Sequence, residues 1–150
     1  MTIKSVFHVN INCTDFERSK RFYEMLGFTS VVNIPEGGSE EMGRGLGDPN
    51  AQGKATIMML NPDDRHGTRL DLIEWTNPAT KGSPPPDLFH AGMARLCLYC
   101  TDLDDHVTAL KEADVELVSD PAELMKGTRF VCFKDPDGTF IELIEFTSPD

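Results

Sequence analysis

One short motif, Cys-Thr-Asp, occurs twice in this 150-residue chain, at positions 13–15 and 100–102, and constrains its fold more than any other feature. Each copy follows a strand-like run and precedes a segment with apolar residues at helical spacing. A second matching pair, LDLIEW at 70–75 and IELIEF at 141–146, closes each half of the chain. The two offsets are 87 and 71 residues, and a glycine-rich stretch at 36–54 accounts for most of the difference. The chain is therefore predicted to hold two tandem β-α-β-β-β modules.

The alternation of apolar and polar residues predicts where the main elements lie. In the strand-like run near residue 8, Phe7, Val9 and Ile11 alternate with polar side chains, whereas capping residues and a helical stripe follow each Cys-Thr-Asp. Glu74 and Glu145 are predicted to face solvent. We expect helices near 15–26 and 102–113 and strands near 5–12, 28–34, 55–60, 68–76, 93–100, 115–119, 128–134 and 139–146.

These elements predict a single α+β domain over residues 1–150. The first module covers about 4–76 and the second about 92–147, joined by a proline-rich connector at 77–91 that neither helix nor strand would tolerate. The stretch at 36–54 holds six of the twelve glycines. It is interpreted either as a flexible surface loop or as a lid over a binding site.

Composition narrows the classes of function. A net charge of −11 disfavours nucleic acid as a partner, because an acidic surface repels phosphates. No apolar run is long enough to span a membrane, and the N-terminal segment lacks a signal-peptide core, so a cytoplasmic location is expected. Cys97 and Cys100 form a CxxC motif inside a strand-like run, where they point to opposite sides. They are interpreted as small buried free thiols rather than as a redox or zinc site.

Three motifs together resemble the vicinal oxygen chelate superfamily, the group of glyoxalase I, extradiol dioxygenases, fosfomycin-resistance enzymes and bleomycin-resistance proteins. They are His8-x-Asn10-x-Asn12-x-x-Asp15, FYxxLGF at 22–28 and DPDGxxIEL at 135–143. The resemblance implies a fold in which the two modules form a half-open barrel around a divalent metal ion. It also implies a homodimer.

The resemblance implies four positions for metal ligands, in the first and last strands of the two modules. His8 and Glu142 match the family pattern, and Asp71 is one methylene shorter than the usual glutamate. Arg95 stands where a second histidine is usual. The sequence pattern also predicts a cation near these residues. Asp71 and Glu142 each interrupt an apolar strand, and a carboxylate among apolar neighbours needs a compensating positive charge.

Arg95 leaves two interpretations open. In one, His8, Asp71 and Glu142 bind a divalent ion (Mn, Fe, Mg, Ni or Zn), and Arg95 clamps an anionic substrate. In the other, the guanidinium replaces the metal and no cofactor is needed. The remaining candidates for substrate binding share the polar strand faces or offer aromatic surface: Asn10, Asn12, Trp75 and Tyr99.

Three functions follow from these interpretations, all acting on a small molecule. The first is a lyase or isomerase of the glyoxalase-like type, in which a metal polarises vicinal oxygens and Glu142 is the catalytic proton carrier. The alternative is a metal-free protein that binds or sequesters a small molecule, as bleomycin-resistance proteins do. A dioxygenase ranks below both, because the two-His, one-carboxylate triad is incomplete.

Overall fold

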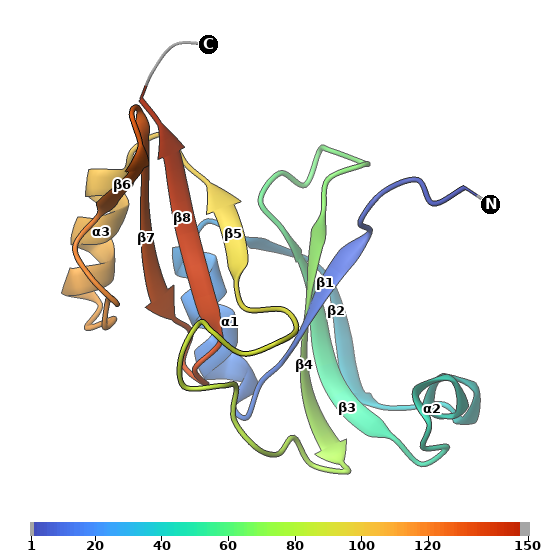
Figure 1. Cartoon of the computed structure of the whole chain (residues 1–150). Helices are drawn as coiled ribbons and strands as arrows, with labels where there is room; N and C mark the ends of the chain where they lie inside the picture. Colours follow the sequence, from blue (N-terminus) through green and yellow to red (C-terminus); the bar gives the residue numbers. More distant parts are fainter. Residues whose placement is uncertain (1, 148–150) are drawn as a thin grey trace. The chain divides into compact units, whose positions relative to one another are not determined.

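The computed structural model describes residues 2–147 and divides into two compact units, Met1–Gly82 and Ser83–Asp150. Each unit contains one four-stranded sheet (Figure 1). The first unit is formed by β1 (His8–Asn12), α1 (Phe16–Met25), β2 (Thr29–Gly37), α2 (Glu40–Leu46), β3 (Gln52–Met59) and β4 (Arg69–Asn77). The second is formed by β5 (Leu96–Tyr99), α3 (Leu103–Glu112), β6 (Ala122–Met125), β7 (Thr128–Lys134) and β8 (Phe140–Phe146).

The two sheets have the same topology, and the predicted α+β fold with two β-α-β-β-β modules is confirmed. Their strand orders are β1-β4-β3-β2 and β5-β8-β7-β6, and in each the first and last strands of the module pair in parallel. Asn10 lies opposite Asp71 in the first sheet, and Cys97 lies opposite Glu142 in the second. These pairs are related by the sequence offsets of 87 and 71 residues, so the duplication extends to the register of the strands.

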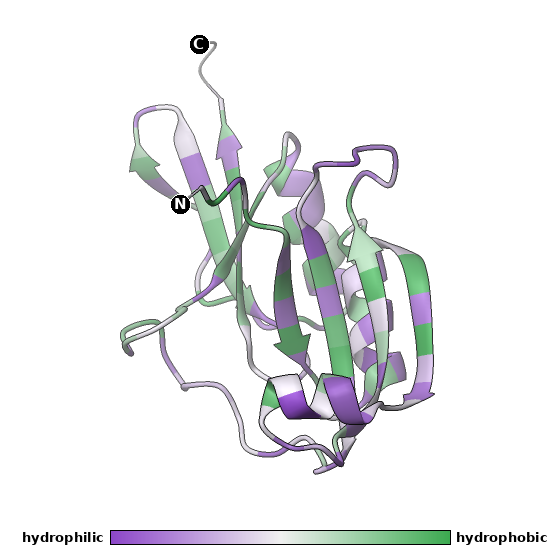
Figure 2. Ribbon diagram, turned by 90° about the vertical axis from the view of Figure 1, so that its right-hand side faces the viewer, coloured by the Kyte–Doolittle hydropathy of each residue, from purple (hydrophilic) through white to green (hydrophobic). Residues whose placement is uncertain are grey.

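One helix covers one face of each sheet and buries the core there. Hydrophobic and hydrophilic residues alternate along several strands (Figure 2), as expected where the two faces of a sheet differ. In the first unit, Phe22 and Tyr23 of α1 are buried, as are Leu70 and Leu72 of β4. In the second, the buried hydrophobic residues between α3 and β8 include Leu103, Val107, Leu110, Ile141 and Leu143.

Two sequence predictions about local structure are wrong. Residues 115–119 do not form a strand: Leu117 makes only an isolated bridge to Phe133, and β6 at Ala122–Met125 occupies the edge of the sheet instead. The glycine-rich stretch is not a flexible loop throughout, because it contains α2, and its interpretation as a lid stays a prediction. Ser39 caps this helix by accepting a hydrogen bond from the Met42 amide at 3.1 Å, and Gly47 ends it with φ of 91°.

The prediction that Glu74 and Glu145 face solvent is also wrong. Glu74 accepts a hydrogen bond from the Phe16 amide at 2.8 Å, and Glu145 accepts one from the Leu103 amide at 3.1 Å. Both amides belong to the first helical residue, where the backbone has no partner within the helix. Alternation placed the two carboxylates on the correct face, but that face is covered by a helix whose N-terminus attracts an anion.

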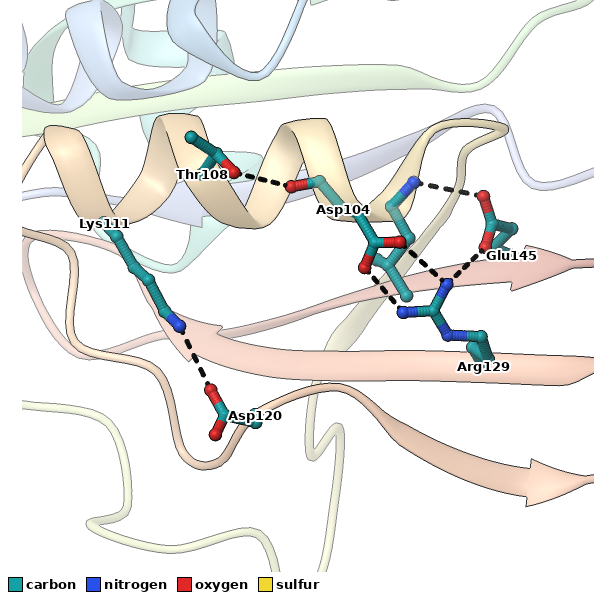
Figure 3. A network of polar contacts seen from close by, with 7 residues as sticks. Asp104, Thr108, Lys111, Asp120, Arg129 and Glu145 are labelled. Atoms are coloured by element: carbon teal, nitrogen blue, oxygen red, sulfur yellow. Dashed lines mark hydrogen bonds and ion pairs between the residues drawn. The ribbon is translucent and has the colours of Figure 1, made fainter.

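Arg129 of β7 joins the second of these carboxylates to the surface of α3 (Figure 3). It donates hydrogen bonds to Asp104 at 2.6 Å and to Glu145 at 3.4 Å. The guanidinium thereby lowers the pKa of Asp104.

Within residues 2–147, no helix is both long and apolar enough to cross a lipid bilayer.

Candidate functional site

The polar face predicted for the first strand is present on β1. His8, Asn10 and Asn12 are exposed, while Ile11 between them is buried. The side-chain amide nitrogen of Asn10 donates to the backbone oxygen of Asp71 at 3.1 Å. The side-chain oxygen of Asn12 accepts from the indole nitrogen of Trp75 at 2.9 Å. Each asparagine therefore has a partner on β4, and the position of the Trp75 ring is held by Asn12.

Asp71 carries the least satisfied polar atom of this face. Its Oδ1 is buried and has no hydrogen-bond partner among the described residues. Burial raises the pKa of this carboxyl group, and the nearby charge of His8 and the Asn10 side chain oppose that shift only in part. A carboxylate in this state would be stabilised by a cation, so His8 and Asp71 remain a candidate half of a metal site.

In the second unit, the buried carboxylate already has a cationic partner. Nε of Arg95, which immediately precedes β5, forms an ion pair with Oε2 of Glu142 on β8. The Glu142 side chain is 6% exposed, whereas the Arg95 side chain is 43% exposed. The guanidinium of Arg95 thus supplies a cation beside Glu142, as the sequence predicted for this carboxylate.

Two cysteines flank Glu142 on the same face of the sheet. Cys97 of β5 and Cys132 of β7 both lie opposite Glu142 in the strand register, and the Cys97 thiol donates to Oε1 of Glu142 at 3.5 Å. Cys132 is a site neighbour that the sequence analysis missed, although the alternation of TRFVCFK could have placed it on this face. All four cysteines are free, as predicted. Cys97 is exposed rather than buried, because β5 is the edge strand.

The Cys97 thiol is held in its neutral form. Partial burial and the negative charge of Glu142 raise the pKa of Cys97 to about 11, and Arg95 opposes this only in part. Further along the same face, the rings of Tyr99 and Phe146 stack at 5.6 Å, and both residues are exposed. Tyr99 therefore presents an aromatic surface rather than a packed core ring.

The predicted site residues are thus distributed over two groups. The first unit brings together Asp71, Asn10, Asn12 and Trp75 with His8 on the same strand, and the second brings together Arg95, Glu142, Cys97 and Cys132. Taken unit by unit over residues 2–147, no three histidine, cysteine, aspartate or glutamate side chains are grouped so that they could hold a metal ion.

With this geometry established, comparison with known proteins identifies the family. Residues 5–143 match the Glyoxalase/Bleomycin resistance protein/Dioxygenase superfamily, and the chain belongs to it. The uncharacterized protein YwkD of Bacillus subtilis (strain 168) is 31% identical over 146 residues, which cover 97% of this chain and 99% of that protein. A glyoxalase family protein from Bacillus cereus has the same fold, with a TM-score of 0.88 and 20% identity over 99% of this chain and 97% of that chain.

Two further structures with this fold differ in what they hold or bind. FosX, a fosfomycin resistance protein from Listeria monocytogenes, was crystallised with Mn(II) and sulfate; it gives a TM-score of 0.63 at 13% identity over 97% of this chain and 95% of that chain. TnmS3, an antibiotic binding protein from Streptomyces sp. CB03234, gives a TM-score of 0.63 at 24% identity over 97% and 98%. Both likenesses concern the fold alone.

The charge of Glu142 has a measurable effect on its neighbouring thiol. We expect Glu142→Gln to lower the pKa of Cys97, because it removes a negative charge that disfavours the thiolate. The rate of Cys97 alkylation by iodoacetamide at pH 8 should rise, by about tenfold for each pKa unit lost. Peptide mass spectrometry resolves Cys97 from the other cysteines. Glu123→Gln, on an exposed strand of the same unit, is the control, and an unchanged or slower reaction of Cys97 would contradict the assignment.

Proposed function

We propose that this protein binds a small molecule that carries either an anionic group or two vicinal oxygens. We further propose that it does so without a metal at Glu142. The ion pair between Arg95 and Glu142 supports this proposal. Glu142 engages Nε of Arg95, while the two Nη groups have no partner among the described residues. A guanidinium held in this way presents a planar fork of N–H donors that matches two adjacent oxygens.

The neighbours of the pair suit a binding site. A metal bound by Glu142 would have to displace the guanidinium or tolerate its charge nearby, and the neutral Cys97 thiol is a poor ligand. In the second unit, the exposed ring of Tyr99 is proposed to contact the ligand. Asn10, Asn12 and Trp75 remain proposed substrate-binding residues on the polar face of the first unit. The neighbour described as an antibiotic binding protein shows that the fold also serves a binding function.

A second candidate function, a metal-dependent lyase or isomerase, is favoured by Asp71. Its Oδ1, which has no hydrogen-bond partner within residues 2–147, and His8 on the neighbouring strand are of the oxygen and nitrogen donor types that a divalent ion prefers. Such an ion would polarise vicinal oxygens of a substrate when bound. His8 and Asp71 would contribute to holding it. In the second unit, Glu142 would be available as a ligand or as a proton carrier only after parting from Arg95. The first unit therefore offers at most two donors, and in the second unit Glu142 is already paired with Arg95.

The two candidates are separated by metal content and ligand binding in the purified natural protein. We expect less than one equivalent of divalent metal by elemental analysis, and binding of oxalate or pyruvate in calorimetry that persists in EDTA. Arg95→Met should abolish this binding, whereas the exposed control Arg21→Met should not. One equivalent of metal, with binding that EDTA removes, would instead establish the second candidate.

The homodimer implied by the family resemblance remains a prediction. Most soluble homo-oligomers are closed symmetric dimers, so two equivalent sites per assembly are expected. Light scattering at micromolar concentrations checks this, and a mass near the 16.7 kDa of one chain would contradict it.

A further inference from the structure

The second unit contains a pocket of about 270 Å³ that no predicted site residue lines. This volume is near the lower end of the range for small-molecule sites. The residues that form most of its wall come from β7, from the start of β8 and from two loops: Leu88, Phe89, Leu117, Val118, Lys134 and Phe140. Five of these six are apolar, so the pocket suits a hydrophobic body of fragment size.

Lys134 places an unneutralised positive charge beside this apolar wall. Its Nζ donates to the backbone oxygen of Pro86 at 3.4 Å and lies 5.0 Å from the centroid of the Phe140 ring. Neither contact is with an anion, and Lys134 has no carboxylate partner within residues 2–147. Lys134 is exposed at the mouth of the pocket, and its ammonium contacts only a carbonyl and a ring, so it can donate to an incoming anion.

The acidic residues of the pocket do not remove this charge. Asp87 accepts hydrogen bonds from the Phe89 amide at 2.9 Å and pairs with His90 at 3.1 Å. Glu116 is exposed and therefore well solvated. The pocket thus combines an apolar wall with a single cation that lacks an ionic partner.

The pocket is separate from the Arg95–Glu142 pair but lies on the same face of the sheet. Lys134 lies opposite Phe140 in the register of β7 and β8, two residues along from Cys132 opposite Glu142. Two residues of a strand span roughly 7 Å, so a fragment in the pocket need not contact Glu142. Phe89 is 93% exposed at the pocket, which leaves an aromatic ring available for a ligand to cover.

From these observations we propose that the pocket binds a small aromatic carboxylate, with its ring against Phe140 and Phe89 and its carboxylate on Nζ of Lys134. The binding site goes beyond the proposed function and does not depend on it. Aromatic surface contributes through burial and ring contacts, and the ammonium contributes the preference for an anion over a neutral isostere. The preference of the pocket for an anionic ligand is therefore assigned to Lys134.

The test uses two matched probes, 1-naphthoate and its neutral counterpart 1-naphthamide, titrated into the full chain by calorimetry. We expect naphthoate to bind about tenfold more tightly than naphthamide, and Lys134→Met to remove this difference while leaving naphthamide binding unchanged. Lys126→Met removes an exposed lysine outside the pocket and should change neither affinity. Val118→Asp, at an exposed position of the wall, should weaken naphthoate, whereas Leu124→Asp on exposed β6 should not.

Three outcomes would overturn the proposal. Equal affinities for the two probes would show that Lys134 does not select the carboxylate over the neutral amide. Loss of naphthoate binding with Arg95→Met but not with Lys134→Met would place the carboxylate at Arg95, which would support the proposed function and reject this pocket. Absence of probe binding, together with a dimer mass that Phe89→Asp reduces to that of one chain, would assign the exposed apolar surface to a second copy.

Discussion

Replacing Arg95 with histidine is expected to raise the affinity of the protein for a divalent metal by at least about tenfold. In the natural protein, the guanidinium of Arg95 forms an ion pair with Glu142 and places a fixed positive charge beside it. The substitution removes that charge and adds an imidazole, which is a good ligand for Zn²⁺ and Ni²⁺. Calorimetric titration of Ni²⁺ into both proteins near pH 7.5 gives the two affinities directly.

Two control variants separate the loss of charge from the gain of a ligand. Arg95→Met removes the positive charge alone and should give a smaller gain than Arg95→His. Adding Glu142→Gln to Arg95→His should reverse most of the gain, because it removes the carboxylate ligand. Tight metal binding by the natural protein that Arg95→His leaves unchanged would contradict the metal-free proposal and make Arg95 a substrate clamp. Equal weak binding by all variants would mean that Arg95 does not control this site.

The second large effect is expected at Glu145, whose side chain is 10% exposed (Figure 3). Glu145→Ala removes the acceptor for the Leu103 amide and one partner of Arg129. A hydrogen bond to a charged group contributes about 1.5–3 kcal/mol, and the alanine leaves a helix-terminal amide buried without a partner. We expect the free energy of unfolding to fall by about 2–3 kcal/mol, measured by urea denaturation.

The duplicated fold supplies a matched control for this change. Glu74→Ala removes the corresponding acceptor of the Phe16 amide. Within residues 2–147, Glu74 forms no ion pair comparable to that of Glu145 with Arg129. We expect a loss of about 1 kcal/mol, in the usual range for a helix cap. Trp75, the only tryptophan, lies in the first unit, so its fluorescence reports that unit while circular dichroism reports both. A loss at Glu145 no larger than that at Glu74 would mean that Arg129 adds nothing.

Much of the fold followed from the sequence because repeated motifs and the alternation of residues can be recognised without knowing any tertiary contact. The spacing of the repeated Cys-Thr-Asp motif and of LDLIEW and IELIEF predicted the duplication, and the parallel pairing of Asn10 with Asp71 and of Cys97 with Glu142 obeys it. Alternation also predicted the polar face of β1, since side chains of a strand point to opposite sides in turn.

Local signals were insufficient wherever a residue's partner lies far along the chain. Residues 115–119 alternate like a strand, but the edge of the second sheet is taken by residues 122–125, a competition that the sequence of one segment does not reveal. In the glycine-rich stretch, the number of glycines obscured the Ser39 cap of α2. Glu74 and Glu145 were read as solvated because alternation assigns a face but does not say which helix covers it.

The same distinction between sequence and tertiary structure applies to the residues of the candidate site. The sequence by itself determined that Glu142 and Asp71 interrupt apolar strands, and the family resemblance implied that Arg95 stands in place of a histidine. Only the tertiary structure decided that the guanidinium of Arg95 pairs with Glu142 and that Cys97 and Cys132 flank this carboxylate. It also decided that Asp71 keeps a buried oxygen with no partner among residues 2–147. The physical reason is that residue type and alternation determine which charges must be compensated, whereas the identity of the compensating group depends on strand pairing between residues as much as 61 positions apart.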